Sequence, residues 1–196
     1  MRNYIFLFLA LFIFSCNEAP KKQTTETVVE KEVLIPDSLL GKDLEGNAIL
    51  VGKISYAQME KFGQAWFTPD YDRYKVNASL LEQIKPLLNG KKVSLLMGTW
   101  CEDSQREVPG MMKILAAAGY AVNELEIIAV DEDKRTPSGI EKPFAATYVP
   151  ALIFYSEGQE MNRIVEFPIG TFEEDIFAIL SGKDYKHAYA EWPKSY

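Results

Sequence analysis

The sequence predicts an α/β protein with a mixed central sheet, and three observations lead to this prediction. A continuous apolar run at residues 93–97 is typical of a strand that is covered on both faces. The segment after it carries apolar residues at helical spacing, and a second apolar run follows at residues 126–131. Two more apolar runs then flank a turn at residues 157–159, before a last helix. The order strand, helix, strand, hairpin, helix indicates an α/β sandwich.

The elements before the first apolar run are short. Residues 49–51 predict a strand after the turn at residues 43–47, and Ser55 can cap a short helix through Phe62. Residues 36–76 also hold an aromatic group around Pro69, made of Trp66, Phe67, Tyr71 and Tyr74. We interpret this segment as an N-terminal extension whose rings pack against the sheet, because such rings bury large areas. The alternative, an aromatic wall beside the functional site that receives a partner, stays open.

Residues 77–182 form the predicted core. Asn77 or Ser79 can cap a helix at residues 80–88, which the pair at 89–90 ends. The helix after the first strand has one buried face that ends at Gly119 and consists of Val108, Met111, Met112, Leu115 and Ala118. Residues 132–147 are long enough for either a helix or a loop. A hairpin pairs residues 151–155 with 163–167, Thr171 caps a helix that closes at Gly182, and residues 183–196 form a tail.

The N-terminus carries a targeting segment. Arg2 gives a positive start, and the apolar run at residues 4–14 is too short to span a bilayer comfortably. Residues 13–16 resemble a bacterial lipobox, which predicts a signal peptide at residues 1–15 and a lipid on Cys16. An ordinary cleaved signal with an incidental Cys remains the alternative. Residues 16–35 are polar and predict a flexible tether. Residues 36–196 then form one globular domain. We expect the protein in the bacterial envelope, anchored by its lipid and facing the periplasm or the outer membrane.

Composition excludes several functional classes. The chain has a formal charge of −7 and no basic run, so nucleic acid is not an expected partner. Its one His, His187, excludes a His-rich metal site, and there is no Gly-rich phosphate loop. We therefore expect neither a metal nor a cofactor.

The chain has only two Cys. If Cys16 carries a lipid, Cys101 is the sole thiol, and no internal disulfide can form. Cys101 lies where the first strand passes into a helix, and unpaired N–H groups and the helix dipole favour a thiolate there. A lone thiol at that position, in an oxidising compartment, indicates nucleophilic or redox work. A buried and inert Cys remains the alternative.

Two motifs carry a resemblance to a known family. The first motif consists of Trp100, Cys101, Glu102, Asp103 and Ser104, and Pro109 follows it. It resembles the thioredoxin active site, in which Trp-Cys-x-x-Cys opens a helix that a Pro kinks. The second is similar to that family's cis-Pro segment and precedes the strand at 151–155: Thr147, Tyr148, Val149 and Pro150. The chain thus resembles the thioredoxin-like superfamily over about residues 75–182. The resemblance implies a thioredoxin-like three-layer α/β/α sandwich with a mixed central sheet, here with an N-terminal extension.

The resemblance also assigns roles at the site. Cys101 would be the nucleophile, while Ser104 stands where the family has a second, resolving Cys. Ser104 cannot resolve a mixed disulfide, but its hydroxyl can donate a hydrogen bond to the Cys101 thiolate. Trp100, Val149 and Pro150 would bind substrate.

Three acidic residues surround this motif. Glu107 falls where the membrane-anchored, TlpA-like branch often has a Glu, and it is the candidate proton relay. Glu102 and Asp103 add like charge beside a thiolate, although carboxylates also favour the start of a helix. We interpret these two as helix-start residues rather than catalytic carboxylates.

The predicted function is therefore thiol–disulfide exchange in the envelope through one nucleophilic Cys without an internal resolving Cys, as in a monothiol oxidoreductase or isomerase. The expected partners are protein or small-molecule thiols and disulfides, with the membrane engaged through the lipid. Two alternatives stay open, a non-catalytic thioredoxin-fold binding module and a single-Cys thiol sensor or weak peroxidase. The peroxidase branch typically has a Thr three residues before its Cys, where this chain has Gly98.

Overall fold

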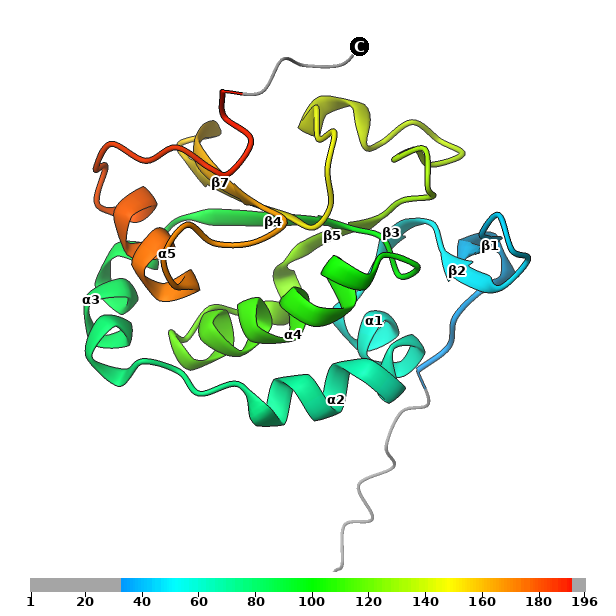
Figure 1. The fold of residues 1–196 in the computed structure, drawn as a ribbon, viewed down its shortest axis with the longest axis horizontal. Coiled ribbons are helices and arrows are strands. Elements are labelled where there is room, and N and C mark those ends of the chain that lie inside the picture. The colour runs from blue at the N-terminus through cyan, green and yellow to red at the C-terminus, as the bar shows by residue number, and fades with distance from the viewer. Residues whose placement is uncertain (1–32, 192–196) are drawn as a thin grey trace, which may run out of the picture. The chain divides into compact units, whose positions relative to one another are not determined.

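A computed structural model describes residues 33–191 of the chain (Figure 1). Five strands form a mixed sheet in the order β3 (Gly52–Ile54), β5 (Glu126–Ala129), β4 (Lys92–Met97), β6 (Ala151–Ser156) and β7 (Gln159–Val165). Strand β4 pairs in parallel with β5 and antiparallel with β6, and the two outer pairings are antiparallel. Five of the six residues of β4 are buried, as its continuous apolar run predicts for a central strand.

The five α-helices of the described residues pack on one face of this sheet (Figure 1): α1 (Tyr56–Phe62), α2 (Gln64–Arg73), α3 (Ala78–Leu88), α4 (Glu102–Ala117) and α5 (Phe172–Leu180). Helix α4 lies at the centre of this layer, and its predicted apolar face is buried in the main core. Met111 and Met112 are fully buried there, so they serve packing. The predicted mixed sheet with flanking helices is confirmed.

Capping residues begin three of the helices where the sequence places them. Ser55 caps α1 and Thr171 caps α5, each in a capping box, and Asn77 caps α3 with its side-chain oxygen. In a capping box the side chains at the N-cap and at the third helical position each bond the other's backbone N–H. These local signals explain why the starts of α1, α3 and α5 agree with the sequence within two residues.

The N-terminal extension contains more structure than the sequence indicates. A 3-10 turn η1 (Asp37–Leu39) leads into a hairpin of β1 (Leu40–Lys42) and β2 (Ala48–Leu50), and β3 follows at once. The aromatic segment is helix α2, which the sequence analysis did not predict. Phe67 is buried among the rings of Tyr56, Trp66 and Tyr71, and Lys113 of α4 donates to the Tyr71 carbonyl at 2.7 Å. The rings therefore join the helical layer to the main core, which the strands of the sheet share.

The second face of the sheet has a different cover. Leu96, Ile128 and Ile153 lie in a smaller buried cluster there, and residues 131–149 pass over it (Figure 1). For residues 132–147 the sequence left a helix or a loop open, and the structure shows a loop with one 3-10 turn, η3 (Lys142–Phe144). The buried carboxylate of Glu141 accepts hydrogen bonds from both the amide and the hydroxyl of Thr136, which folds the loop back on itself.

A last short element, the 3-10 turn η2 (Val122–Glu124), connects α4 to β5. None of the helices within residues 33–191 is both long and apolar enough to cross a bilayer. The predicted signal peptide, Cys16 and most of the tether fall outside the described residues. The predicted domain boundaries therefore stay predictions.

Candidate active site at the start of α4

The loop between β4 and α4 is held from several sides. The amide of Leu50 donates to the buried hydroxyl of Thr99 at 2.9 Å, and the Gln105 side chain donates to the Thr99 carbonyl at 2.7 Å. At Gly98, an added Cβ would lie 2.6 Å from the indole nitrogen of Trp100. This position therefore needs glycine because the indole ring folds back against its backbone.

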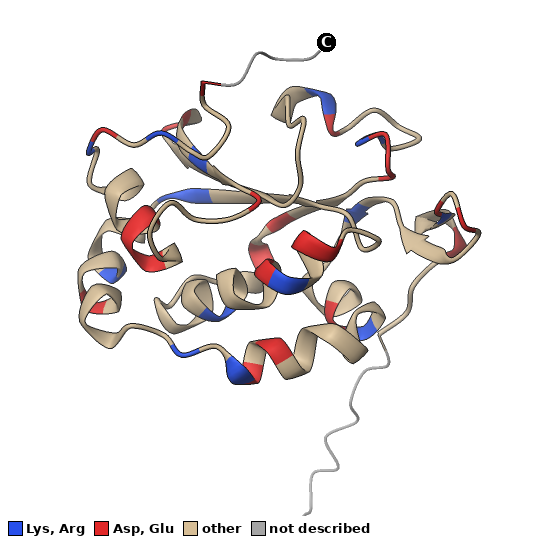
Figure 2. Ribbon diagram, in the orientation of Figure 1, with Lys and Arg blue, Asp and Glu red and all other residues tan. Residues whose placement is uncertain are grey.

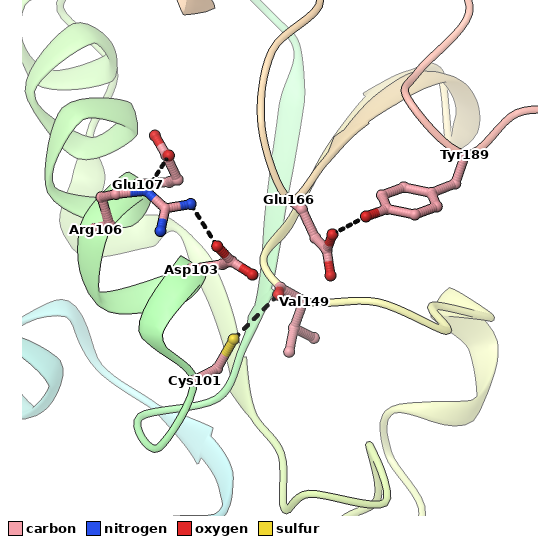
Figure 3. A network of polar contacts seen from close by, with 7 residues as sticks. All are labelled: Cys101, Asp103, Arg106, Glu107, Val149, Glu166 and Tyr189. Carbon is pink, nitrogen blue, oxygen red and sulfur yellow. Dashed lines mark hydrogen bonds and ion pairs between the residues drawn. The ribbon is translucent and has the colours of Figure 1, made fainter.

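Cys101 is the N-cap residue of α4, and its side chain is partly exposed. Its thiol donates to the carbonyl of Val149 at 3.3 Å, and the Val149–Pro150 peptide bond is cis (Figure 3). The register of the sheet explains this meeting, since Leu96 pairs with Ala151 and so places the end of β4 beside Pro150. The structure thus brings together Cys101, Val149 and Pro150, three of the residues that the sequence analysis chose.

Ser104 lies one helical turn after Cys101 and is fully buried. Its hydroxyl accepts a hydrogen bond from the Gly98 amide at 3.2 Å. No hydrogen bond joins Ser104 to Cys101 within the described residues, where the cysteine thiol bonds to Val149. In this structure Ser104 therefore braces the loop, and its direct bond to a thiolate stays a prediction.

The indole of Trp100 is turned toward the loop that follows β5. Its Nε1–H donates to the Val130 carbonyl at 2.8 Å, and the Lys134 ammonium lies 5.2 Å from the ring centre. The ring also packs against the smaller cluster on the second face of the sheet. These contacts fix the orientation of the indole, and its part in binding substrate stays a prediction.

Charges at the start of α4 are paired with one another. Figure 2 shows acidic residues at this helix start, and Figure 3 shows Arg106 between Asp103 and Glu107. Arg106 bonds the carboxylate of Asp103, and its Nε lies 2.7 Å from an oxygen of Glu107. The hydrogen bond to Glu107, and to a smaller extent the one to Asp103, raises the pKa of Arg106. The pairing offsets the like charge that Asp103 would otherwise place beside a Cys101 thiolate.

Glu107 is further from the sulfur than a direct proton relay requires. It lies six residues along the helix from Cys101, or about 9 Å along the helix axis at 1.5 Å per residue. Figure 3 shows it beyond Arg106, on the far side from Cys101. Its assignment as proton relay therefore stays a prediction, and a relay from this position would have to pass through another group.

An aromatic cluster that was not predicted from the sequence lies beside the cis bond. Tyr148 precedes Val149, and its ring stacks on that of Tyr189 with centroids 4.2 Å apart. Tyr189 also meets the ring of Phe167 edge-on and donates to the Glu166 carboxylate. That hydrogen bond, with partial burial, raises the pKa of Tyr189 to about 12. The signal in the sequence was a pair of tyrosines four residues apart, Tyr185 and Tyr189, in a segment taken for a plain tail.

The arrangement provides a thiol at a helix start, beside a backbone carbonyl and an aromatic cluster. The unpaired N–H groups of the first helical turn can stabilise negative charge on the Cys101 sulfur. Among the described residues, no group of three or more His, Cys, Asp and Glu side chains could hold a metal ion. The chemistry available from the residues present is that of a nucleophilic thiol.

Comparison with known proteins supports the fold. A protein of unknown function from Pseudomonas aeruginosa matches with 13% identity and a TM-score of 0.51, over 67% of this chain and 93% of that one. An HIV epitope scaffold matches with 13% identity and a TM-score of 0.51, over 68% and 95%. Mitochondrial thioredoxin 3 from Saccharomyces cerevisiae, in its oxidized form, has 22% identity over 49% and 86%, with a TM-score of 0.30. No protein-family model and no curated protein matches the chain.

The class of the protein follows from the fold. It is an α/β protein with a mixed five-stranded sheet and flanking helices, and it shares this fold with the two proteins matched at a TM-score of 0.51. At these identities the similarity concerns the fold, and activity has to be argued from the site itself.

Proposed function

We propose that the protein carries out thiol–disulfide exchange through Cys101 alone, without an internal resolving Cys. The observation that carries this proposal is the position of the partly buried Cys101 at the start of α4, with its sulfur 3.3 Å from the Val149 carbonyl beside a cis Pro150.

The reaction balances with one outside thiol. The Cys101 thiolate attacks one sulfur of a partner disulfide, a new S–S bond forms, and the other partner sulfur leaves as a thiolate. The Cys101 thiol, which donates a hydrogen bond to the Val149 carbonyl in the resting protein, loses its proton to solvent before the attack. A second thiol from solution then attacks the mixed disulfide and releases Cys101. Ser104 cannot take that step, because its oxygen forms no disulfide.

The same proposal places the protein in the bacterial envelope, with Cys16 lipidated. The apolar run and lipobox-like residues 13–16 support it. Mass spectrometry of native protein extracted from membranes tests it. An acylated N-terminal Cys16 is the expected result, and an unmodified N-terminus downstream of Cys16 would refute the anchor.

Three proteins test the chemistry: the natural chain, Ser104→Cys and Cys101→Ser. Ser104→Cys places a second thiol one helical turn from the first, so it should increase reduction of a protein disulfide such as that of insulin. The natural chain should instead accumulate mixed disulfides whose lifetime shortens as a small thiol is added. Cys101→Ser is nearly isosteric and should abolish both behaviours while its thermal unfolding remains that of the natural chain.

The outcome in cells separates this proposal from the binding-module alternative. Each variant is introduced into a strain that lacks the gene. If Cys101→Ser restores the lost phenotype fully, exchange chemistry has no role in the cell, and the binding-module hypothesis replaces this proposal.

A further inference from the structure

The chain from residue 183 to residue 191 returns to the site that Cys101 occupies. Tyr185 fixes this segment, which we call the C-terminal strap, at two points. Its hydroxyl donates to the buried carboxylate of Asp175 in α5 at 2.8 Å, and its carbonyl accepts from the Asn162 side chain of β7 at 2.8 Å. The strap is therefore held on both the last helix and the edge strand, and its course past the site is defined.

Tyr189 is the residue of the strap that reaches the site. Its ring stacks on Tyr148 at an interplanar angle of 20° and meets Phe167 edge-on at 6.1 Å. Its hydroxyl donates to Glu166, whose own amide donates to the Pro150 carbonyl at 2.7 Å. The ring thus stacks on Tyr148, which directly precedes the cis Val149–Pro150 bond, and its hydroxyl bonds Glu166, which bonds the Pro150 carbonyl.

The position of Tyr189 relative to Cys101 gives it a steric role. Figure 3 shows Val149 and Glu166 between the cysteine sulfur and the tyrosine ring, so the two lie on opposite sides of the cis segment. A small disulfide needs only the space next to the sulfur. An extended polypeptide that approached Cys101 from the side of the cis segment on which Tyr189 lies would meet the Tyr189 ring.

We propose that Tyr189 sets the size of the disulfide that Cys101 accepts. With the ring on Tyr148 the site reacts with small disulfides, and an extended polypeptide disulfide reacts after the strap lifts. This inference rests on the proposed exchange function, and the step is the one written above, with the partner disulfide as oxidant. Lifting also uncovers the rings of Tyr148 and Phe167, which gives an incoming polypeptide an aromatic surface to replace the one that it displaces.

Tyr189→Ala tests the proposal. The natural chain and the variant are reacted with oxidised glutathione and with an extended peptide that carries a mixed disulfide, and mixed-disulfide formation is timed. The rate with the peptide should rise about ten-fold, because a stacked ring and a charged hydrogen bond are both lost. The rate with oxidised glutathione should stay within about two-fold, because the ring does not cover the sulfur itself. Parallel changes in the two rates, or no change in either, would overturn the proposal.

Tyr189→Phe is the matched control. It keeps the stacked ring and loses the bond to Glu166, so its rate with the peptide should fall between those of the other two proteins. An equal rate for Tyr189→Phe and Tyr189→Ala would assign the effect to the hydrogen bond and contradict a role for the ring.

Alkylation separates failure of this inference from failure of the exchange function. Iodoacetamide and a maleimide attached to an extended peptide are used on the same proteins, because neither reagent requires exchange activity. Tyr189→Ala should accelerate the peptide reagent and leave iodoacetamide unchanged, and the latter also shows that the Cys101 site is intact. If this contrast is seen but no protein reacts with any disulfide, the exchange function is wrong while the steric role stands. If the two reagents respond alike, the steric role is wrong.

Discussion

Gly98 and Trp100 act as a unit at the point where β4 becomes the active-site loop. The indole occupies the space in which any side chain at residue 98 would begin. It is held there by its hydrogen bond to the Val130 carbonyl. The shape of the loop before Cys101 therefore depends on a missing Cβ as much as on the residues that are present.

Gly98→Ala should destabilise the protein by about 2 kcal/mol, because the added methyl group displaces the indole and breaks its bond to Val130. Chemical denaturation measures the change. The control is the same substitution in a Trp100→Phe background, where the smaller ring leaves more room for the methyl group. A cost of the same size in both backgrounds would show that the two residues do not interact.

The position of Cys101 could be predicted from the sequence, but the orientations of the neighbouring Ser104 and Trp100 side chains could not. A strand, a Gly and a helix pattern are local signals, and they place Cys101 at the helix start, where the structure has it. The bond that Ser104 makes to the Gly98 amide depends on how the loop folds over the helix. Likewise, the orientation of Trp100 is decided by a carbonyl thirty residues further along the chain.

At the scale of elements, the start of α5 holds together segments that are distant in sequence. Glu173 accepts from the Tyr74 hydroxyl at 2.8 Å and from the Asn77 amide at 2.9 Å, which ties α5 to the connection between α2 and α3. Asp175 accepts from the amides of the preceding loop and from Tyr185 of the C-terminal strap. Both carboxylates are buried, so the helix start must be well formed for either bond to exist.

Thr171→Ala should therefore cost about 1 kcal/mol of stability, because it removes the hydroxyl that caps α5. Denaturant unfolding followed by circular dichroism provides the measurement. Thr171→Ser is the control, since it keeps the capping oxygen and should stay near the natural value. Equal losses in the two variants would mean that the hydroxyl does not hold the helix start.

Elements with a cap signal or a clear apolar period were predicted, and elements without one were missed. Helix α2 follows α1 directly through Gly63 and has no side-chain cap, and it contains Pro69, so the sequence shows no ordinary helix start there. Its helical form comes from packing Phe67 between neighbouring rings and α4. Residues 132–147 were ambiguous because the fold of this loop depends on the buried Glu141, and a sequence does not show that this carboxylate is internal.

At the scale of the whole molecule, a group of charges joins three strands at one end of the sheet. Glu126 of β5 lies 2.8 Å from the ammonium of Lys92 in β4 and 3.2 Å from that of Lys53 in β3. The hydrogen bond from Lys92 lowers the pKa of Glu126 from 4.5, with further bonds from Lys53 and Ser94, against an opposing effect of partial burial. Because the folded pKa is depressed, this contribution to stability is complete above pH 4.5 and is lost as the pH falls through the folded value.

Glu126→Gln should lower stability by about 1 kcal/mol at neutral pH, and the difference from the natural chain should shrink as the pH falls below the ordinary range of a carboxyl group. Thermal unfolding across a series of acidic pH values measures both quantities. Glu82→Gln is the control, because Glu82 is 71% exposed and pairs only along its own helix with Lys85. A difference that stays constant with pH for Glu126→Gln would exclude the charge as its cause.

The loop over the second face of the sheet has a consequence for how the molecule opens. The strands beneath it are bonded to one another by their own ladders, β4 to β5 on one side and to β6 on the other. The loop is held by side-chain bonds, such as those from Arg163 to the Phe144 carbonyl and from Thr136 to Glu141, and by Ile140, Phe144 and Ala146 packed on the smaller cluster. It can therefore detach as a separate cooperative unit below the free energy of global unfolding. In native-state hydrogen exchange, amides of residues 134–145 would lose protection at lower denaturant than those of β4. The cover of the second face would then open more often than the helical cover of the first face.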